Sequence, residues 1–230
     1  MRKYNIFLLF VILFLSSLRL NIIAVDLDAR RYSGYSIYNE QDSYVSVNES
    51  YLEEYEEFLA SEKIKKSSYG MRSIESRTLG VVRLAQANYS GCIPSYGCAI
   101  VSVTMFSNYV NNESLSPDYV LTLNGNSCSV NWSNLGSSLN IGSVTAQSNS
   151  NWNTLLSIVK FNINNSRPVI VGLERTINGT RNTHYIVASG YWISGTNSVI
   201  YIKDPGGNNR TSLIQFINDG RTLMNYRVYS

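Results

Sequence analysis

The sequence predicts an α+β fold, because its helical patterns precede its strand patterns. Between residues 98 and 163 apolar residues recur at helical spacing, whereas after residue 167 β-branched and aromatic runs alternate with Gly, Asn and Pro. A parallel, doubly wound sheet would instead alternate strands with helices along the chain. The 230 residues are 44% hydrophobic, which is enough for one core domain with additional segments.

Three helices are predicted ahead of the strands. Residues 98–110, CAIVSVTMFSNYV, have little polar face and predict a buried helix. Residues 116–125, SPDYVLTLNG, supply a serine cap, a proline at the first helical position and a glycine just past the end. Residues 152–163, WNTLLSIVKFNI, are apolar on one face and predict an amphipathic helix.

Four strand patterns follow, and they are RPVIVGLE (167–174), HYIVASGYW (184–192), SVIYIKDPG (198–206) and LMNYRVYS (223–230). The four residues SGTN, between the second and third strand patterns, predict that these two strands form a tight hairpin. His184 opens one strand of that hairpin and Asp204 closes the other. We therefore expect an imidazole and a carboxylate twenty residues apart to lie side by side.

The N-terminus has the pattern of a secretory signal, which we assign to residues 1–24. Arg2 and Lys3 precede an apolar run from Ile6 to Leu15, and Ala24 is an acceptable cleavage point. The alternative is an uncleaved anchor, but the run is shorter than the roughly 20 residues of a spanning helix. We expect a secreted or cell-surface protein with no stable membrane span after cleavage.

Residues 25–79 differ in charge from the rest of the chain. Asp26–Leu79 carries 11 acidic and 7 basic residues, whereas residues 80–230 carry 5 acidic and 9 basic ones. Within the acidic part, SYLEEYEEFLASEKIKK (50–66) predicts an amphipathic helix, and SSYGMRSIESRTLG (67–80) resembles a linker. One interpretation is a pro-segment that masks a basic catalytic domain and is later removed, which would make the protein a zymogen; the other is a simple N-terminal extension.

Cys98 is the candidate nucleophile. It follows a glycine at the predicted start of a buried helix, where backbone N–H groups and the helix dipole favour a thiolate. His184, the only histidine, is the one imidazole that could act as general base and acid, and Asp204 could orient it. The Cys98 N–H and the Gln86 side-chain amide are candidate donors to an oxyanion.

Taken in order, these residues resemble the C39-like branch of the papain-like cysteine peptidases. The resemblance covers residues 80–230 and rests on Gln86, Gly-Cys opening a helix, RPVIVGL, HYIVASGYW and IYIKDPGG. It implies a papain-like fold with helices packed on an antiparallel sheet, and a Cys98–His184–Asp204 triad with Gln86 in the oxyanion hole. The sequence departs from the usual pattern at Ala99, where glycine is common, and in the interval of twelve residues from Gln86 to Cys98.

Cys92 is the alternative nucleophile, because it lies six residues after Gln86, the commoner papain-like interval. Against it, Pro94 and Gly97 make CIPSYG a poor helix start. The chain has three cysteines, so at least one thiol has no partner for a disulfide within the chain. Cys92 and Cys128 could pair and leave Cys98 free, or all three could be unpaired with Cys98 merely buried.

These features favour a secreted cysteine peptidase that hydrolyses peptide bonds through an acyl-thioester, with a protein or peptide as substrate and its own N-terminal segment as a further partner. A cell-wall amidase, an acyltransferase of the same fold and a non-catalytic secreted binding module are the alternatives. The net charge of +3 without a Lys/Arg cluster argues against nucleic acid. One histidine and scattered cysteines lack metal-ligand spacing, so we expect no metal and no cofactor.

Overall fold

A computed structural model describes residues 49–68, 74–148, 151–207 and 210–230. The helices are α2 (Glu49–Ser68), α3 (Ile93–Tyr96), α4 (Cys98–Val110), α5 (Pro117–Leu123), α6 (Trp132–Ser138), α7 (Trp152–Asn164) and α8 (Leu213–Asn218), with a 3-10 turn η1 (Gln86–Asn88). The strands are β1 (Ile74–Thr78), β2 (Val144–Ser148), β3 (Val169–Ile177), β4 (Thr180–Ser194), β5 (Asn197–Lys203) and β6 (Thr222–Tyr229). The expected signal segment, residues 1–24, lies outside the described residues.

The strands form one antiparallel sheet in the order β1-β4-β3-β6-β2, with β5 also paired to β4. Strand β4 organises this sheet, since its first part pairs with β3 and its last part lies between β1 and β5. The predicted α+β class is therefore confirmed. The hairpin of β4 and β5 is also confirmed, because Ser194 pairs with Asn197 and Trp192 with Val199.

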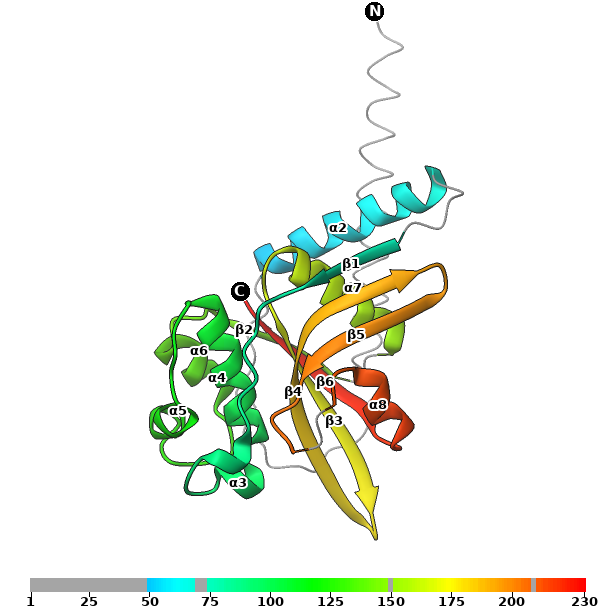
Figure 1. The fold of residues 1–230 in the computed structure, drawn as a ribbon. Helices are drawn as coiled ribbons and strands as arrows, with labels where there is room; N and C mark the ends of the chain where they lie inside the picture. The colour runs from blue at the N-terminus through cyan, green and yellow to red at the C-terminus, as the bar shows by residue number, and fades with distance from the viewer. Residues whose placement is uncertain (1–48, 69–73, 149–150, 208–209) are drawn as a thin grey trace, which may run out of the picture. The chain divides into compact units, whose positions relative to one another are not determined.

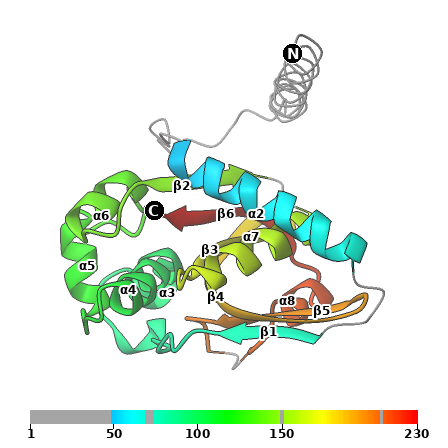
Figure 2. The same ribbon diagram turned by 90° about the horizontal axis from the view of Figure 1, so that it is seen from above.

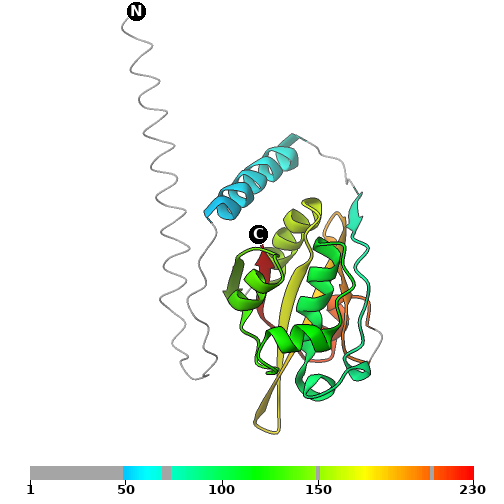
Figure 3. The ribbon, with the colours of Figure 1, turned by 90° about the vertical axis from the view of Figure 1, so that its left-hand side faces the viewer.

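Helices α3, α4, α5 and α6 gather on one side of the strands (left in Figure 1) and stand in front of the sheet when seen from that side (Figure 3). Helix α4 packs on β4 and β3 and is buried from Ala99 to Ser107. Its nearly all-apolar sequence thus fills the space between the sheet and the other helices. The predicted helices α5 and α7 also form, and the Ser116 hydroxyl caps α5 by accepting a bond from the Asp118 N–H.

Several elements, the short helix α3 among them, were missed or assigned differently from the sequence. Residues 74–78 form β1 and not a linker; they were misread because only Glu75 of the five is even half-buried, which leaves no alternation to recognise. Helix α6 and strand β2 carry too few apolar residues for a clear period, and the six residues of α8 are too few to show one. The second strand pattern begins at Thr180, four residues before His184, so His184 lies within β4 and opposite Leu173 of β3.

Helix α2 packs on α7 and runs along it (Figure 2). The Tyr51 ring, 2% exposed, contacts the Phe161 ring at 5.5 Å between centroids, and the Asn162 amide donates to the Tyr51 hydroxyl at 2.8 Å. Glu62 of α2 and Glu75 of β1 both pair with Lys160 of α7. Among the described residues, no helix has both the length and the apolar character needed to cross a membrane.

Candidate active site

Cys98 is the first residue of α4, and its position depends on Gly97. A Cβ on Gly97 would lie 2.5 Å from the Ile93 Cα, so only glycine lets α3 approach the start of α4 this closely. The first N–H groups of a helix have no acceptor within the helix, and the dipole there favours negative charge. The half-buried Cys98 side chain therefore lies where a thiolate would be stabilised.

Cys92 and Cys128 form a disulfide, and Cys98 is the cysteine that keeps its thiol. The sequence left open whether Cys92 and Cys128 pair or all three cysteines are unpaired, and the structure has the pairing, which leaves Cys98 available. Cys92 precedes the short helix α3, and its sulfur is occupied in the bond. It thus cannot act as a nucleophile while the disulfide is intact.

His184 and Asp204 lie side by side, as the hairpin predicted. The His184 Nε2 and the Asp204 Oδ1 are 2.7 Å apart, with the Asp204 side chain 1% and the His184 side chain 14% exposed. The β4–β5 register, which pairs Val187 with Lys203, brings the two together. Because Asp204 occupies Nε2, Nδ1 is the ring nitrogen that remains for another partner.

The charges of this pair are coupled to Cys98. Burial of the imidazole lowers its pKa, but hydrogen bonds with Asp204 and Cys98 and the charges of both outweigh this and raise the pKa of His184 to about 9. Burial of the Asp204 carboxyl raises its pKa, but the His184 bond and charge and the Gly206 N–H hold it below its ordinary value. At neutral pH the arrangement therefore favours an imidazolium between a carboxylate and the sulfur.

The loop after β5 is held by residues to which the sequence analysis gave no role. The Gly206 N–H donates to the Asp204 Oδ1 at 2.8 Å, and a Cβ at Gly206 would lie 3.1 Å from that oxygen and 3.4 Å from the His184 Cε1. Arg83 donates from Nε to the Asp204 carbonyl oxygen at 2.6 Å and from Nη2 to that of Gly206. Arg83 lies three residues before Gln86, but a lone arginine in an apolar run carries no signal of this role.

Gln86 begins η1 and is joined to the same loop through its backbone, since its N–H donates to the Pro205 carbonyl oxygen at 2.9 Å. Its side-chain Nε2 donates to the Pro94 carbonyl oxygen at 2.9 Å, and its Oε1 is buried without a partner in the described residues. An amide nitrogen has two N–H groups, so one remains beside the bond to Pro94. The structure thus ties Gln86 to both the Asp204 loop and the segment that leads into Cys98.

The assembled groups are those of nucleophilic catalysis: a thiol at a helix start, an imidazole that can take and return a proton, and a buried carboxylate that orients it. The expectation of no metal rests on the sequence, and the described residues contain no cluster of three or more His, Cys, Asp or Glu side chains suited to a metal ion.

Comparison with known proteins identifies the family of the chain. No curated protein matched the chain. The model of the peptidase C39-like family matches residues 78–229, which begins at the last residue of β1 and includes Gln86, Cys98, His184 and Asp204. This family has a papain-like fold, and its name indicates a cysteine peptidase. Because the match covers more than half of the chain, the protein belongs to the peptidase C39-like family.

Proposed function

We propose that the protein is a secreted cysteine peptidase that hydrolyses peptide bonds through Cys98, His184 and Asp204. The observation that carries the proposal is the buried His184–Asp204 pair, 2.7 Å between Nε2 and Oδ1, beside a thiol at the start of α4. Any buried histidine needs hydrogen-bond partners, but a carboxylate on one side and a cysteine at a helix start on the other form the arrangement that nucleophilic catalysis requires. Perturbed groups of this kind concentrate at functional sites.

In the proposed reaction the Cys98 thiolate attacks the carbonyl carbon of the scissile bond. The carbonyl electron pair moves onto oxygen, and the Cys98 N–H together with the remaining N–H of Gln86 stabilises that oxyanion. The tetrahedral intermediate then collapses, and the His184 imidazolium gives its proton to the departing amine nitrogen. An acyl-thioester on Cys98 and a neutral imidazole remain.

Deacylation returns the enzyme to its starting state. The neutral His184 takes a proton from water, whose oxygen attacks the thioester carbonyl carbon. The carbon–sulfur bond breaks, the carboxylic acid product leaves, and Cys98 is a thiolate beside an imidazolium again. Asp204 keeps the ring oriented and favours its charged form throughout, without being protonated itself.

Export through an N-terminal signal, residues 1–24, is part of this proposal. The Arg2–Lys3 pair and the apolar run after it support export, and so does the Cys92–Cys128 disulfide, because such bonds persist in oxidising compartments. Expression of the full chain with antibody detection in the medium, followed by N-terminal sequencing, tests this. A chain retained in the cell with residue 1 intact would contradict it.

We further propose that a removable pro-segment is confined to residues 25–48. Helix α2 contributes the buried Tyr51, and β1 pairs with β4 from Ile74 to Thr78, so both belong to the folded domain. A chain beginning at residue 49 is then expected to fold, and to be more active than one beginning at residue 25 if that segment masks the site. Equal activities of the two would exclude masking.

The peptidase activity is tested with the full chain and the variant Cys98→Ser. The full chain is expected to release peptides from casein and to be labelled by iodoacetamide. The variant Cys98→Ser should lose both. Labelling without casein cleavage, but with release of fragments from peptidoglycan, would change the substrate to the cell wall. A folded protein that neither labels nor hydrolyses would be a binding module and would contradict the proposal.

A further inference from the structure

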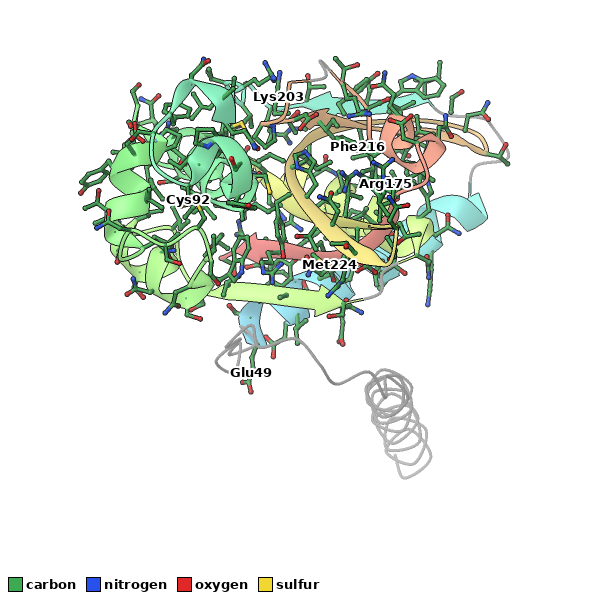
Figure 4. All side chains as sticks on the ribbon, turned by 90° about the horizontal axis from the view of Figure 1, so that it is seen from below. Glu49, Cys92, Arg175, Lys203, Phe216 and Met224 are labelled. Carbon is green, nitrogen blue, oxygen red and sulfur yellow. A yellow bond between two sulfur atoms is a disulfide. The ribbon has the colours of Figure 1, made fainter. Side chains whose placement is uncertain are left out.

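Two arginines, Arg210 and Arg221, lie against Phe216 next to the candidate active site, and a third, Arg175, is linked to them. The Phe216 ring is 1% exposed and lies 5.4 Å from the His184 ring, measured between centroids. The Arg210 guanidinium lies 4.4 Å and that of Arg221 6.0 Å from the centre of the Phe216 ring. Figure 4 labels Phe216, on α8, and the third arginine, Arg175, on β3. One buried ring thus separates the imidazole from two positive charges.

The arginines are linked to one another through two residues. Asp219 pairs through its carboxylate with Arg210, and its carbonyl oxygen accepts a bond from the Arg175 Nη1 at 3.3 Å. Arg221 donates from Nη2 to the Asn182 Oδ1 at 2.9 Å, and Asn182 pairs with Arg175 in the β3–β4 ladder. The strand ends, α8 and the start of β6 therefore hold the three guanidinium groups in one place.

This cluster has more positive charge than its contacts balance. Asp219 is the carboxylate in those contacts, and its ion pair is with Arg210. Burial lowers the pKa of Arg221, and the charges of Arg175 and Arg210 lower it further. The Arg175 Nε is buried and has no hydrogen-bond partner within the described residues. A buried donor without a partner, close to like charges, is costly unless a ligand satisfies it.

The charges of the arginine cluster also interact with those of the proposed catalytic residues. The charges of Cys98 and Asp204 both raise the pKa of Arg221, and that of Arg210 lowers the pKa of Asp204. The contacts of Arg210 and Arg221 with the Phe216 ring, which lies against His184, and these charge interactions both place the cluster next to the proposed catalytic residues. All three arginine side chains are half-buried, so their guanidinium groups are partly desolvated and partly accessible.

We propose that this arginine cluster, Arg175, Arg210 and Arg221, binds a carboxylate of the substrate next to the scissile bond, with Arg221 and Arg175 as the recognising groups. The inference rests on the proposed peptidase function and adds its substrate class. A guanidinium matches a carboxylate with two parallel N–H donors, and a partly desolvated pair of this kind is strong and directional. The carboxylate comes either from an Asp or Glu side chain or from the free C-terminus of a peptide.

The test compares matched fluorogenic peptides that carry Glu or Gln at each position flanking the scissile bond, each with a free or an amidated C-terminus. The full chain should cleave one acidic member at least about tenfold faster, in kcat/KM, than its neutral match. A preference for Glu over Gln identifies a side-chain carboxylate, and a preference for the free over the amidated end identifies a C-terminal one.

Variants connect that preference to the cluster. Arg221→Gln should reduce the acidic-to-neutral ratio to near one, and Arg221→Lys, which keeps the charge but not the paired N–H donors, should retain only part of it. Arg167→Gln is the matched control, because it removes the same charge from a side chain that faces Glu54 of α2. Thermal unfolding of each variant checks that the loss is not one of folding.

A second measurement does not depend on hydrolysis. Cys98 is alkylated with iodoacetate, which is an anion, and with iodoacetamide, which is neutral. The ratio of the iodoacetate rate to the iodoacetamide rate should fall several-fold in Arg221→Gln and stay constant in Arg167→Gln. Peptide cleavage with no acidic preference, or a ratio that Arg221→Gln leaves unchanged, would overturn the inference while the peptidase function stood. If Cys98 is alkylated but no peptide is cleaved, the proposed peptidase function is contradicted. The ratio of the two alkylation rates would still show whether the arginine cluster attracts an anion to Cys98.

Discussion

Within the part of the chain that the structure describes, the charge cluster around Lys160 and the one around His184 can be compared directly. The Lys160 side chain is 9% exposed and pairs with Glu62 of α2 and Glu75 of β1. The His184 side chain is 14% exposed and pairs with Asp204. Each cluster places a basic group between elements far apart in the sequence, and in each the acidic partners raise the pKa of the basic group against the effect of burial.

The two clusters differ in how completely their hydrogen bonds are satisfied. Glu62 and Glu75 both bond to the Lys160 ammonium, and the cluster joins α7 to α2 and β1. At the other cluster the Asp204 Oδ2 and the Gln86 Oε1 are buried without partners in the described residues, and a thiol lies beside the imidazole. A cluster whose hydrogen bonds are all satisfied indicates a structural role. A cluster that keeps unpaired polar atoms beside a nucleophile indicates a catalytic role.

The largest effects on activity should come from substitutions in the His184 cluster. Cys98→Ser and His184→Ala are each expected to lower kcat/KM by about 10³-fold or more, because each removes a group that forms or breaks a bond. Initial rates on a cleavable peptide measure this. Cys98→Ser should leave the free energy of unfolding in urea close to that of the unchanged protein, and a large loss of stability in this variant would place Cys98 among the structural residues. His184→Ala also leaves the buried Asp204 carboxylate without its partner, so it is expected to lower the free energy of unfolding as well.

Replacing Lys160 should have the opposite profile. Lys160→Ala leaves two carboxylates without their ammonium and is expected to reduce the free energy of unfolding by about 3 kcal/mol. Urea titration measures the loss, with Lys63→Ala, an exposed position on α2, as the matched control. The kcat of the folded fraction should not change. A lower kcat with unchanged stability would overturn the distinction between the clusters.

Asp204→Asn should shift the pH dependence of activity. His184 must be protonated to release the amine, so kcat/KM should fall as the pH rises through about 9, the pKa of His184 in the intact site. Without the carboxylate this pKa drops, and the fall in activity should move to lower pH by about one unit or more, with roughly 10²-fold less activity near neutrality. An unchanged alkaline limit would exclude His184 as its source.

The smallest effects should distinguish the two acids of the Lys160 cluster. The Glu75 side chain is 40% exposed and that of Glu62 17%. Because solvent screens the more exposed pair, Glu75→Gln should cost below about 1 kcal/mol of unfolding free energy, and Glu62→Gln more. Paired urea titrations measure both. The reverse order would mean that Glu75 is the main partner of Lys160.

The sequence was most informative where local patterns and the site coincide. The start of α4 at Cys98 follows from an apolar run directly after a glycine, and the approach of His184 to Asp204 follows from a hairpin whose turn residues are explicit. These two local features were enough to name the groups that lie together. The Cys92–Cys128 bond could be proposed only as one of two possibilities, because spacing does not determine which cysteines meet.

Contacts between distant segments could not be predicted from the sequence. Arg83 reaches the Asp204 loop across 121 residues, and Phe216 lies against His184 from a six-residue helix that was not recognised. The Lys160 cluster also depends on three elements, of which β1 was misread. Such contacts depend on tertiary packing, and a single charged or aromatic residue in a sequence does not specify its partner.

The most direct test of the account is an NMR titration of the histidine side chain, because His184 is the only histidine and its signal needs no assignment. The account predicts a midpoint near pH 9 in the unmodified protein, and lower midpoints in both Cys98→Ala and Asp204→Asn. A midpoint near 6.5, the ordinary value, that neither substitution moves would contradict the coupling of sulfur, imidazole and carboxylate.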